Sequence, residues 1–342
     1  MWLTKKDKRD NNIIDFVITW VDGDDPEWRA EKHRYEKQAG FTNDNRDVRY
    51  RDFDLLRYWF RAVEQNASWV HKIHFVTWGH IPEWLNTSNP KIDIVRHSDF
   101  MPKKYLPTFS STAIEMNLHR IKDLSEKFVY FNDDMFILNK TKPTDFFKNG
   151  LPCDTAIADA IVPFGKDMFE HRLVNNSNIV NKYYKIRTVI KKHPLQWFNF
   201  RYGAMQLFTL PMLMKQNFST IKSFHLPTSL TKEWFKFLWQ NEEAVMENTS
   251  IQKFRNITSV NPWLVQDLQI ASGKFTPRSP KIGKNIPLDN DISSIQTLVE
   301  KSNYKLLCLN DSTQIKDFEA TKKYLRRSFE NRFPDKSSFE VR

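Results

Sequence analysis

The stretch KFVYFNDDMFIL, residues Lys127 to Leu138, decides the fold that the sequence predicts. Its two ends are the apolar and aromatic runs of a buried β-strand, but its centre holds Asn132, Asp133 and Asp134. Adjacent carboxylates repel each other, and burying either one without a partner is costly. The triplet is therefore either an ordinary turn at the end of a strand or a site that holds a divalent cation.

The ligand type narrows the choice of cation. A ligand set made only of oxygens favours Mg²⁺ or Mn²⁺, and these ions typically also hold the phosphates of a nucleotide. The short acidic motif of metal-dependent nucleotide-sugar enzymes works in this way. An Asx turn explains the same three residues equally well, and the triplet alone leaves both explanations open.

Strands and helices alternate along the residues that precede this stretch. Because strand, helix, strand, strand, helix and strand follow one another, we expect an α/β fold with a doubly wound, mainly parallel sheet. Such sheets bind ligands beyond the carboxyl ends of their strands. The expected strands cover residues 13–20, 72–79, 91–100 and 127–138, and the expected helices cover residues 52–70 and 109–125.

The pattern becomes less regular after Gly150, where aromatic and basic clusters predominate. We expect an additional, mostly helical region with two or three helices in residues 210–249. Residues 277–287, PRSPKIGKNIP, lack an apolar period and indicate a loop. Residues 298–311 return to a helix followed by a strand, and residues 317–333 indicate a basic helix with one apolar stripe.

The net charge of +11 favours anionic partners, but no nucleic-acid-binding signature is present. The two cysteines, Cys153 and Cys308, are far apart and fit a reducing compartment. Residues 1–12 lack the apolar core of a signal peptide. We therefore expect a cytoplasmic protein. The basic C-terminal helix either lies on anionic lipid, as a peripheral contact at the inner face of the plasma membrane, or packs its stripe on the domain.

Several further residues carry a functional and an ordinary structural explanation. Glu115 fits a capping box with Thr112, and it also lies close to a helix N-terminus suited to anions. His225 could serve as a base or a phosphate ligand, although a single histidine is more often structural. Arg255 is one charge among many until the fold places it near an anion. The acidic turn at Asp22 is, by itself, only a turn.

Four blocks of the chain resemble the Stealth family of hexose-1-phosphate transferases. IDFVITWVDGDDPEW (residues 14–28) is similar to the first conserved block. RYRDFDLLRYWFRAVEQNASWVHKIHFVTWG and LPTFSSTAIEMNLHRIKDLSEKFVYFNDDMFI (residues 49–79 and 106–137) resemble the second, which is long enough to be very specific. Residues 224–235 with 253–269 resemble the third, and CLND (residues 308–311) the fourth.

The resemblance implies a glycosyltransferase-A-like α/β fold and a specific reaction. The family transfers a sugar-1-phosphate from a UDP-sugar to a hydroxyl of a glycan acceptor, which forms a phosphodiester and releases UMP. In bacteria this reaction belongs to capsular or cell-surface polysaccharide synthesis. Residues 1–150 would form the nucleotide-sugar-binding half, residues 151–316 the acceptor and catalytic half of the same domain, and residues 317–342 the basic helix.

The resemblance also assigns roles to individual residues. The catalytic set it implies is Glu115, His225, Arg255 and Asp134. Asp133 and Asp134 match the family's metal-associated pair, here for Mg²⁺ or Mn²⁺. The nucleotide-binding set it implies consists of Asp22, Gly23, Asn132, Asn310 and Asp311. Either Glu115 or His225 would take the proton of the acceptor.

Two other functions fit the same acidic motif. A metal-dependent glycosyltransferase would break the bond between sugar and oxygen and release UDP. A non-catalytic module would bind a nucleotide sugar or a glycan, but would have no need for Glu115, His225 and Arg255 together. The sequence identifies neither the donor sugar, the acceptor, the linkage nor the oligomeric state.

Overall fold

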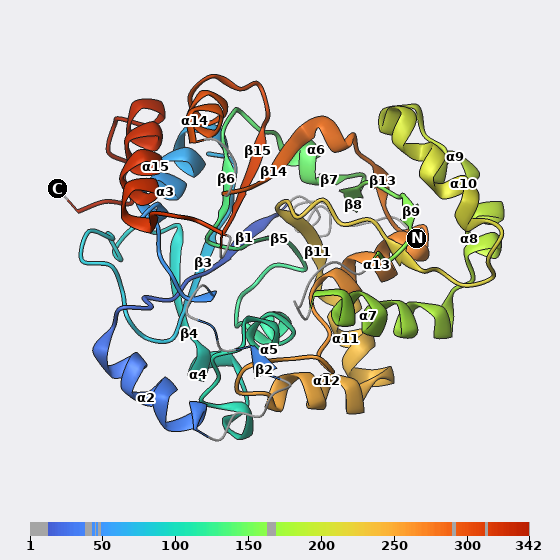
Figure 1. The fold of residues 1–342 in the computed structure, drawn as a ribbon, viewed down its shortest axis with the longest axis horizontal. Coiled ribbons are helices and arrows are strands. Elements are labelled where there is room, and N and C mark those ends of the chain that lie inside the picture. Colours follow the sequence, from blue (N-terminus) through green and yellow to red (C-terminus); the bar gives the residue numbers. More distant parts are fainter. Residues whose placement is uncertain are drawn as a thin grey trace, which may run out of the picture.

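A five-stranded sheet lies at the centre of the molecule, which is described by a computed structural model (Figure 1). The structure describes residues 13–37, 43–44, 46, 49–162, 169–288, 292–311 and 314–341. The strand order is β11-β5-β1-β3-β4, and only β11 runs antiparallel to its neighbour. The strands are β1 (Asp15–Thr19), β3 (Ile73–Thr77), β4 (Ile92–Arg96), β5 (Lys127–Phe131) and β11 (Thr228–Thr231).

Both faces of this sheet are buried. Successive residues of β1 point into two different hydrophobic cores, since Val17 contributes to one core and Phe16 and Ile18 to the other. A strand buried on both faces requires the nearly continuous apolar runs seen in the sequence. The prediction of a doubly wound, mainly parallel α/β sheet is therefore confirmed.

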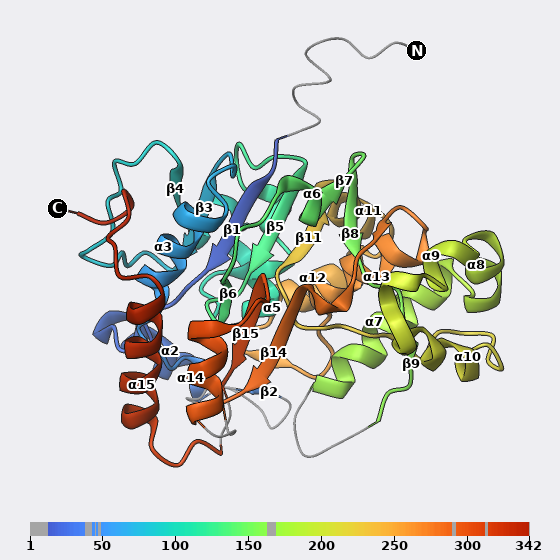
Figure 2. The same cartoon turned by 90° about the horizontal axis from the view of Figure 1, so that it is seen from above.

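Helices cover the two faces (Figures 1 and 2). The first core lies under α5, α11 and α13, and the second lies under α3, α14 and α15. The α-helices of the first 150 residues are α2 (Pro26–Glu36), α3 (Leu56–Asn66), α4 (His97–Phe100), α5 (Ser111–Glu115) and α6 (Pro143–Phe146). Those that follow are α7 (Phe169–Tyr183), α8 (Ile186–Lys192), α9 (Pro194–Trp197), α10 (Thr209–Met212), α11 (Lys232–Asn241), α12 (Glu243–Ile251), α13 (Trp263–Ala271), α14 (Ile292–Lys301) and α15 (Phe318–Arg332). The 3-10 segments are η2 (Lys103–Tyr105), η3 (Leu118–Arg120), η4 (Phe200–Phe208) and η5 (Pro280–Ile282).

Short sheets extend the molecule around the central one. In one of the two three-stranded sheets, β14 (Gly283–Pro287) runs parallel to β15 (Leu306–Asn310), which pairs antiparallel with β6 (Met135–Ile137). The prediction of a loop over residues 277–287 is wrong at this point, because backbone pairing to β15 forms a strand that has no apolar alternation of its own. The remaining strands are β2 (Asn43–Asp44), β7 (Phe147–Lys148), β8 (Leu151–Asp154), β9 (Ala158–Asp159), β10 (Thr220–Ile221), β12 (Arg255–Asn256) and β13 (Thr276–Pro277).

The helix expected over residues 109–125 is also interrupted. Only α5 and the short η3 form, and both contribute buried apolar residues to the same core. Asn117 lies between them, and its side-chain amide donates to the carbonyl of Ala113 and to the hydroxyl of Ser250. A polar residue with local backbone bonds of this kind competes with helix continuation.

The C-terminal helix α15 packs its apolar stripe into the second core. Leu325 and Phe329 are buried there. The residues that follow are held by Arg61 of α3, whose guanidinium donates to both carboxylate oxygens of Glu340 at 2.8 and 3.0 Å. Of the two alternatives for this helix, packing of its stripe on the domain is confirmed.

Candidate active site

The carboxyl ends of β1 and β5 open into a cavity of about 500 Å³. The chain leaves β1 toward β3 and β4 on one side of the sheet and later returns on the other side as β5. This reversal of strand order is the switch point at which open α/β sheets bind ligands. Eight of the ten residues expected in the site line the cavity, namely Glu115, Asn132, Asp133, Asp134, His225, Arg255, Asn310 and Asp311.

The acidic pair lies where β5 ends. The Asp133 side chain is accessible to solvent from the cavity that it lines, and the walls of this cavity are protein. Burial, together with the charge of Asp134, raises the pKa of Asp133 to about 8. Burial likewise raises the pKa of Asp134, and its Oδ1 atom has no hydrogen-bond partner among the described residues. A pair of carboxyls with a vacant ligand atom and an elevated pKa is the arrangement that a divalent cation stabilises.

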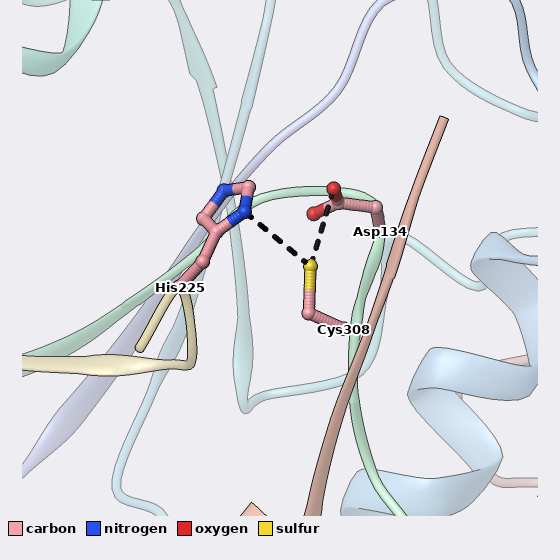
Figure 3. A group of neighbouring side chains, drawn as sticks. All are labelled: Asp134, His225 and Cys308. Carbon is pink, nitrogen blue, oxygen red and sulfur yellow. Dashed lines mark hydrogen bonds between the residues drawn. The ribbon is translucent and has the colours of Figure 1, made fainter. Parts of the chain in front are cut away.

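Cys308, on β15, also faces Asp134. Its thiol lies 3.4 Å from Oδ2 of Asp134 and 3.8 Å from Nδ1 of His225 (Figure 3). These three side chains could hold one ion together. The oxygens of Asp133, Asp134, Asn132 and neighbouring groups fit Mg²⁺ or Mn²⁺, whereas sulfur and nitrogen suit a softer ion such as Zn²⁺. The site thus offers two overlapping donor sets that share Asp134.

Glu115 is buried at the end of α5. The Tyr130 hydroxyl donates to Oε1 of Glu115 at 2.9 Å and lies 2.6 Å from Oδ1 of Asn132. Since that hydroxyl has one proton, protonation of Glu115 would let Tyr130 turn its own proton to Asn132. Burial raises the pKa of Glu115, and the charge of Arg255 opposes this rise. A carboxyl whose pKa is raised in this way is suited to hold and release a proton as a general acid or base.

The capping box proposed for Glu115 does not form. The N-cap of α5 is Ser110, so that Thr112 lies inside the helix rather than at its cap. Ser110 makes no side-chain cap hydrogen bond, and Glu115 reaches Tyr130 on the neighbouring strand instead. The sequence spacing fits a capping box with Thr112 as the N-cap, but the helix begins two residues earlier, with Ser110 as its N-cap.

His225 has an unusual backbone conformation, with φ of 49°. A side chain other than glycine in this left-handed region costs about 1 kcal/mol or more and persists where surrounding contacts fix it. Its ring packs edge-on against Trp263 at 5.5 Å between centroids, and its second ring nitrogen points away from the thiol (Figure 3). Burial lowers the pKa of His225, so the imidazole is neutral at pH 7 and can accept a proton.

Arginine side chains face the acidic groups across the cavity. Arg255 donates to the Ser111 hydroxyl from Nε at 3.2 Å and from an Nη at 2.9 Å, which fixes its guanidinium beside α5. Arg49, Arg51 and Arg172 also line the cavity. Arg51 makes a two-pronged ion pair with Asp311, at 3.0 and 2.7 Å. Asp311 therefore orients Arg51, and its carboxylate is already engaged.

Asp22 and Gly23 do not line the cavity. Oδ1 of Asp22 accepts the backbone N–H of Asp24, as in an Asx turn, and the Asp22 amide donates to Nε2 of His80. Gly23 acts by its small size, because a Cβ atom here would lie 2.0 Å from the carbonyl oxygen of Tyr50. The expectation that these two residues contact the nucleotide receives no support from their positions, but Gly23 lets the cavity-lining segment around Tyr50 approach closely.

Sequence reasoning assigned no role to several residues of the site. Tyr130 falls within an expected buried strand, and Arg49 and Arg51 fall within the segment that resembles the second block of the family. Cys308 had no partner within the sequence, and Arg172 lies 57 residues after Glu115. The one available signal was the RYR triplet of residues 49–51, in which two cations flank an aromatic residue ahead of an acidic one.

Comparison with known proteins gives family matches in two regions. Residues 14–40 match the model described as Stealth protein CR1, conserved region 1, and residues 49–154 match Stealth protein CR2, conserved region 2. A capsular polysaccharide phosphotransferase of Streptococcus pneumoniae, WcwK, is 40% identical over 328 residues, which cover 96% of this chain and 98% of that protein. An exopolysaccharide phosphotransferase of Lactiplantibacillus plantarum, cps2G, is 37% identical with 96% of each covered.

A further relative is also a polysaccharide phosphotransferase. The receptor polysaccharide phosphotransferase WefC of Streptococcus oralis is 37% identical and is covered completely by 96% of this chain. Among solved structures, that of the galactosyltransferase LgtC with donor and acceptor sugar analogues covers 92% of this chain and 95% of its own, with 11% identity and a TM-score of 0.37. This structural likeness is too remote to identify an activity. The sequence relatives, in contrast, span nearly the whole chain, and the protein belongs to the Stealth family of polysaccharide phosphotransferases and is a transferase enzyme.

Proposed function

We propose that this enzyme transfers a sugar-1-phosphate from a UDP-sugar to a hydroxyl of a glycan acceptor, in capsular or cell-surface polysaccharide synthesis. The acceptor oxygen bonds to the β-phosphorus of the donor, and the bond from that phosphorus to the bridging oxygen breaks. UMP leaves with the bonding electrons, and the product is a phosphodiester. The observation that carries the proposal is the convergence of Glu115, Asp133, Asp134, His225 and Arg255 on one cavity.

The acidic pair is suited to hold the donor's diphosphate through a cation. Asp133 and Asp134 would ligate Mg²⁺ or Mn²⁺, with Asn132 beside them on the same turn. When bound, the ion supplies positive charge that offsets the negative charge on the phosphoryl oxygens and on the departing UMP.

Arg255 supports the proposal from the opposite side. Its planar guanidinium is fixed by Ser111, so its remaining N–H groups have a defined direction in the cavity. Fixed donors of this kind stabilise charge that develops in the transition state without a reorganisation cost. Arg49, Arg51 and Arg172 add to the positive potential of the same cavity.

Two groups could take the proton of the acceptor hydroxyl. His225 is neutral at pH 7 because burial lowers its pKa. Glu115 has a raised pKa and a hydrogen bond to Tyr130 that can be rearranged. Either group meets the requirement for a general base, and the other would then orient the acceptor or donor.

The experiment incubates the full chain with a panel of UDP-hexoses, a soluble glycan acceptor and Mg²⁺, and identifies the nucleotide released. The proposal predicts UMP, in an amount equal to new phosphodiester. Release of UDP would establish the alternative, a glycosyltransferase that breaks the sugar–oxygen bond. Tight binding of UDP-sugar with no turnover on any acceptor would favour a binding module. Glu115→Gln and His225→Gln are matched variants for the same assay. Each removes one of the two candidate bases and nearly preserves the size of the side chain.

A further inference from the structure

A lobe at one end of the molecule exposes an unusual number of apolar side chains. The lobe consists of residues 185–215 and contains α8, α9, η4 and α10 (Figures 1 and 2). Six of the thirteen exposed large hydrophobic side chains that the structure describes lie in it. They are Leu195 (79% exposed), Phe200 (80%), Leu207 (59%), Phe208 (57%), Leu210 (48%) and Met214 (80%). Such a concentration marks an interaction surface.

These side chains are exposed by a well-anchored backbone. Trp197 is fully buried and stacks on Phe218, and Tyr202 is buried with its hydroxyl donating to the carbonyl of Gln196 at 2.7 Å. At the other end of the lobe, Arg187 donates to the carbonyl of Leu213 at 2.8 Å and to that of Met214 at 3.0 Å. The anchoring residues point inward, and the apolar tips are therefore held outward by the fold.

The charge of the lobe is exclusively positive. Residues 171–232 contain ten of the chain's 52 Lys and Arg residues and no Asp or Glu, so the other 42 basic residues face 41 acidic ones. Nearly all of the net charge of +11 thus belongs to this segment. Its exposed cations within the lobe are Arg187, Lys191, Lys192, Arg201 and Lys215. Arg201 lies over the exposed ring of Phe200, at 4.6 Å from its centroid.

The exposed apolar side chains and the positive charge of the lobe together indicate which kind of partner binds it. A second copy of this chain packed symmetrically on the lobe would bring like charges together, which disfavours such a dimer. Exposed Phe, Leu and Met tips flanked by Lys and Arg are the pattern of surfaces that insert into the headgroup region of an anionic bilayer. We propose that the lobe of residues 185–215 docks the enzyme on an anionic phospholipid membrane.

In this proposal the membrane contact is made by the lobe and not by α15. That helix uses its apolar stripe in the core, and it lies at the opposite end of the long axis from the lobe (Figures 1 and 2). A flat bilayer seated on the lobe therefore does not reach α15. The two basic surfaces can be compared directly in one assay.

The test is co-sedimentation of the full chain with vesicles of phosphatidylcholine alone or of phosphatidylcholine mixed with phosphatidylglycerol. We expect binding only to the anionic vesicles and a decrease as salt is raised. Lys191→Glu with Lys192→Glu, and separately Phe200→Ser with Met214→Ser, should each lower the partition coefficient about tenfold or more. The matched control is Lys323→Glu with Tyr324→Ser, which alters exposed residues of α15 and should leave binding unchanged.

Each contrary outcome overturns the proposal. Equal binding by the lobe variants and the unaltered chain would show that the lobe does not contact lipid. Loss of binding only in the α15 control would return the contact to that helix. If size-exclusion chromatography showed a dimer that the lobe variants abolish, the lobe would be an interface between two copies. Circular dichroism verifies that each variant is folded.

Discussion

Asp133 and Asp134 are neighbours in the sequence and open into the same cavity, and their repulsion is the physical basis of the proposed metal site. Among the residues that the structure describes, the charges of Arg255 and His225 oppose the rise of these pKa values, but burial outweighs them. Asp52, which accepts a hydrogen bond from Trp20, is a further acid in the cavity wall, and its charge also raises the pKa of Asp133. The energetic cost of holding these acids together is offset when a divalent ion binds.

Asp133→Asn should distinguish the role of this residue in catalysis from its effect on folding stability. We expect kcat to fall by on the order of a hundredfold or more, with loss of Mg²⁺-dependent UDP-sugar binding in calorimetry. The folded, metal-free protein should not be destabilised, since the substitution removes a repulsion. The control is Asp24→Asn, an exposed acid outside the cavity, which should retain activity.

The pH dependence of stability gives an independent test of the same residue. In the metal-free protein the pKa of Asp133 is raised to about 8, so the folded state holds this proton more tightly than the unfolded chain, where Asp titrates near 4. Its contribution to stability is therefore lost as the pH rises from about 4 to 8. Thermal unfolding in EDTA should show Asp133→Asn gaining stability over the unaltered chain across this window. Parallel profiles would contradict the assignment.

Cys308 allows the two donor sets to be distinguished. If Mg²⁺ is held by carboxylate oxygens, Cys308→Ala should keep Mg²⁺-dependent activity within a few-fold. Zn²⁺, which prefers sulfur and nitrogen, should inhibit the unaltered enzyme through Asp134, His225 and Cys308, and the variant should be roughly tenfold less sensitive. The measurement is an inhibition curve with Zn²⁺ at fixed Mg²⁺. Loss of Mg²⁺ binding in the variant would show that the thiol is a ligand of the functional ion.

At the scale of the elements, β1 helps to position the site, and one buried polar residue fixes the start of this strand. Asp15 opens β1 and is fully buried, with its carboxylate accepting from Ser125 N at 2.7 Å and lying 2.7 Å from Nδ1 of His71. It also lies 3.3 Å from Nε2 of His74 on β3. These bonds connect the starts of β1 and β3 to the segment that precedes β5.

Asp15→Asn should destabilise the whole sheet. Burial alone would raise the pKa of Asp15, but hydrogen bonds from His74, Ser125 and His71 outweigh it and lower the pKa to about 2. The associated stability of about 2 kcal/mol is present above pH 4 and is lost as the pH falls toward 2. Urea unfolding should show the deficit of the variant at pH 7 and its decrease near pH 3. Asp93→Asn, in a partly exposed partner of His74, is the matched control with a smaller expected loss.

Gly23→Ala should alter binding without altering the core. Because a Cβ atom would meet the Tyr50 carbonyl at 2.0 Å, the segment that carries Arg49, Arg51 and Asp52 must move. We expect KM for the donor to rise about tenfold or more, with little change in melting temperature. Asp24→Ala in the same turn should have no such effect, and an unchanged KM for Gly23→Ala would show that this segment does not contact the donor.

The elements also show what the sequence could predict. Strands β1, β3 and β5 lie within the ranges 13–20, 72–79 and 127–138, as expected, since apolar runs bounded by turns identify strands buried on both faces. The last range holds two strands rather than one, because the chain turns at Asp133 and Asp134 before β6, and the expected strand over residues 91–100 ends at Arg96, where α4 begins. The strand β14 could not be predicted, because it depends on pairing with β15 rather than on its own residues. In the site, Asp133 and Asp134 were identified by their unusual position. Tyr130 and Arg172 were not, since only the fold brings them to the cavity, and Cys308 was not, since only the fold places it beside Asp134.

At the scale of the whole molecule, the cavity and the lobe of residues 185–215 are formed by different parts of the chain. Segments from β1 to β15 converge on the cavity, while the net positive charge is concentrated in residues 171–232. The active-site and docking proposals are therefore separable, because the lobe variants alter no residue that lines the cavity. Their turnover of a soluble acceptor should equal that of the unaltered enzyme.

The fate of the donor's β-phosphorus tests the central claim most directly. A UDP-hexose labelled at this atom is incubated with the full chain, Mg²⁺ and a soluble glycan acceptor, and the products are separated. The proposed reaction predicts that the label enters the glycan as a phosphodiester and that unlabelled UMP is released. Recovery of the label in UDP, with an unphosphorylated glycan product, would contradict it.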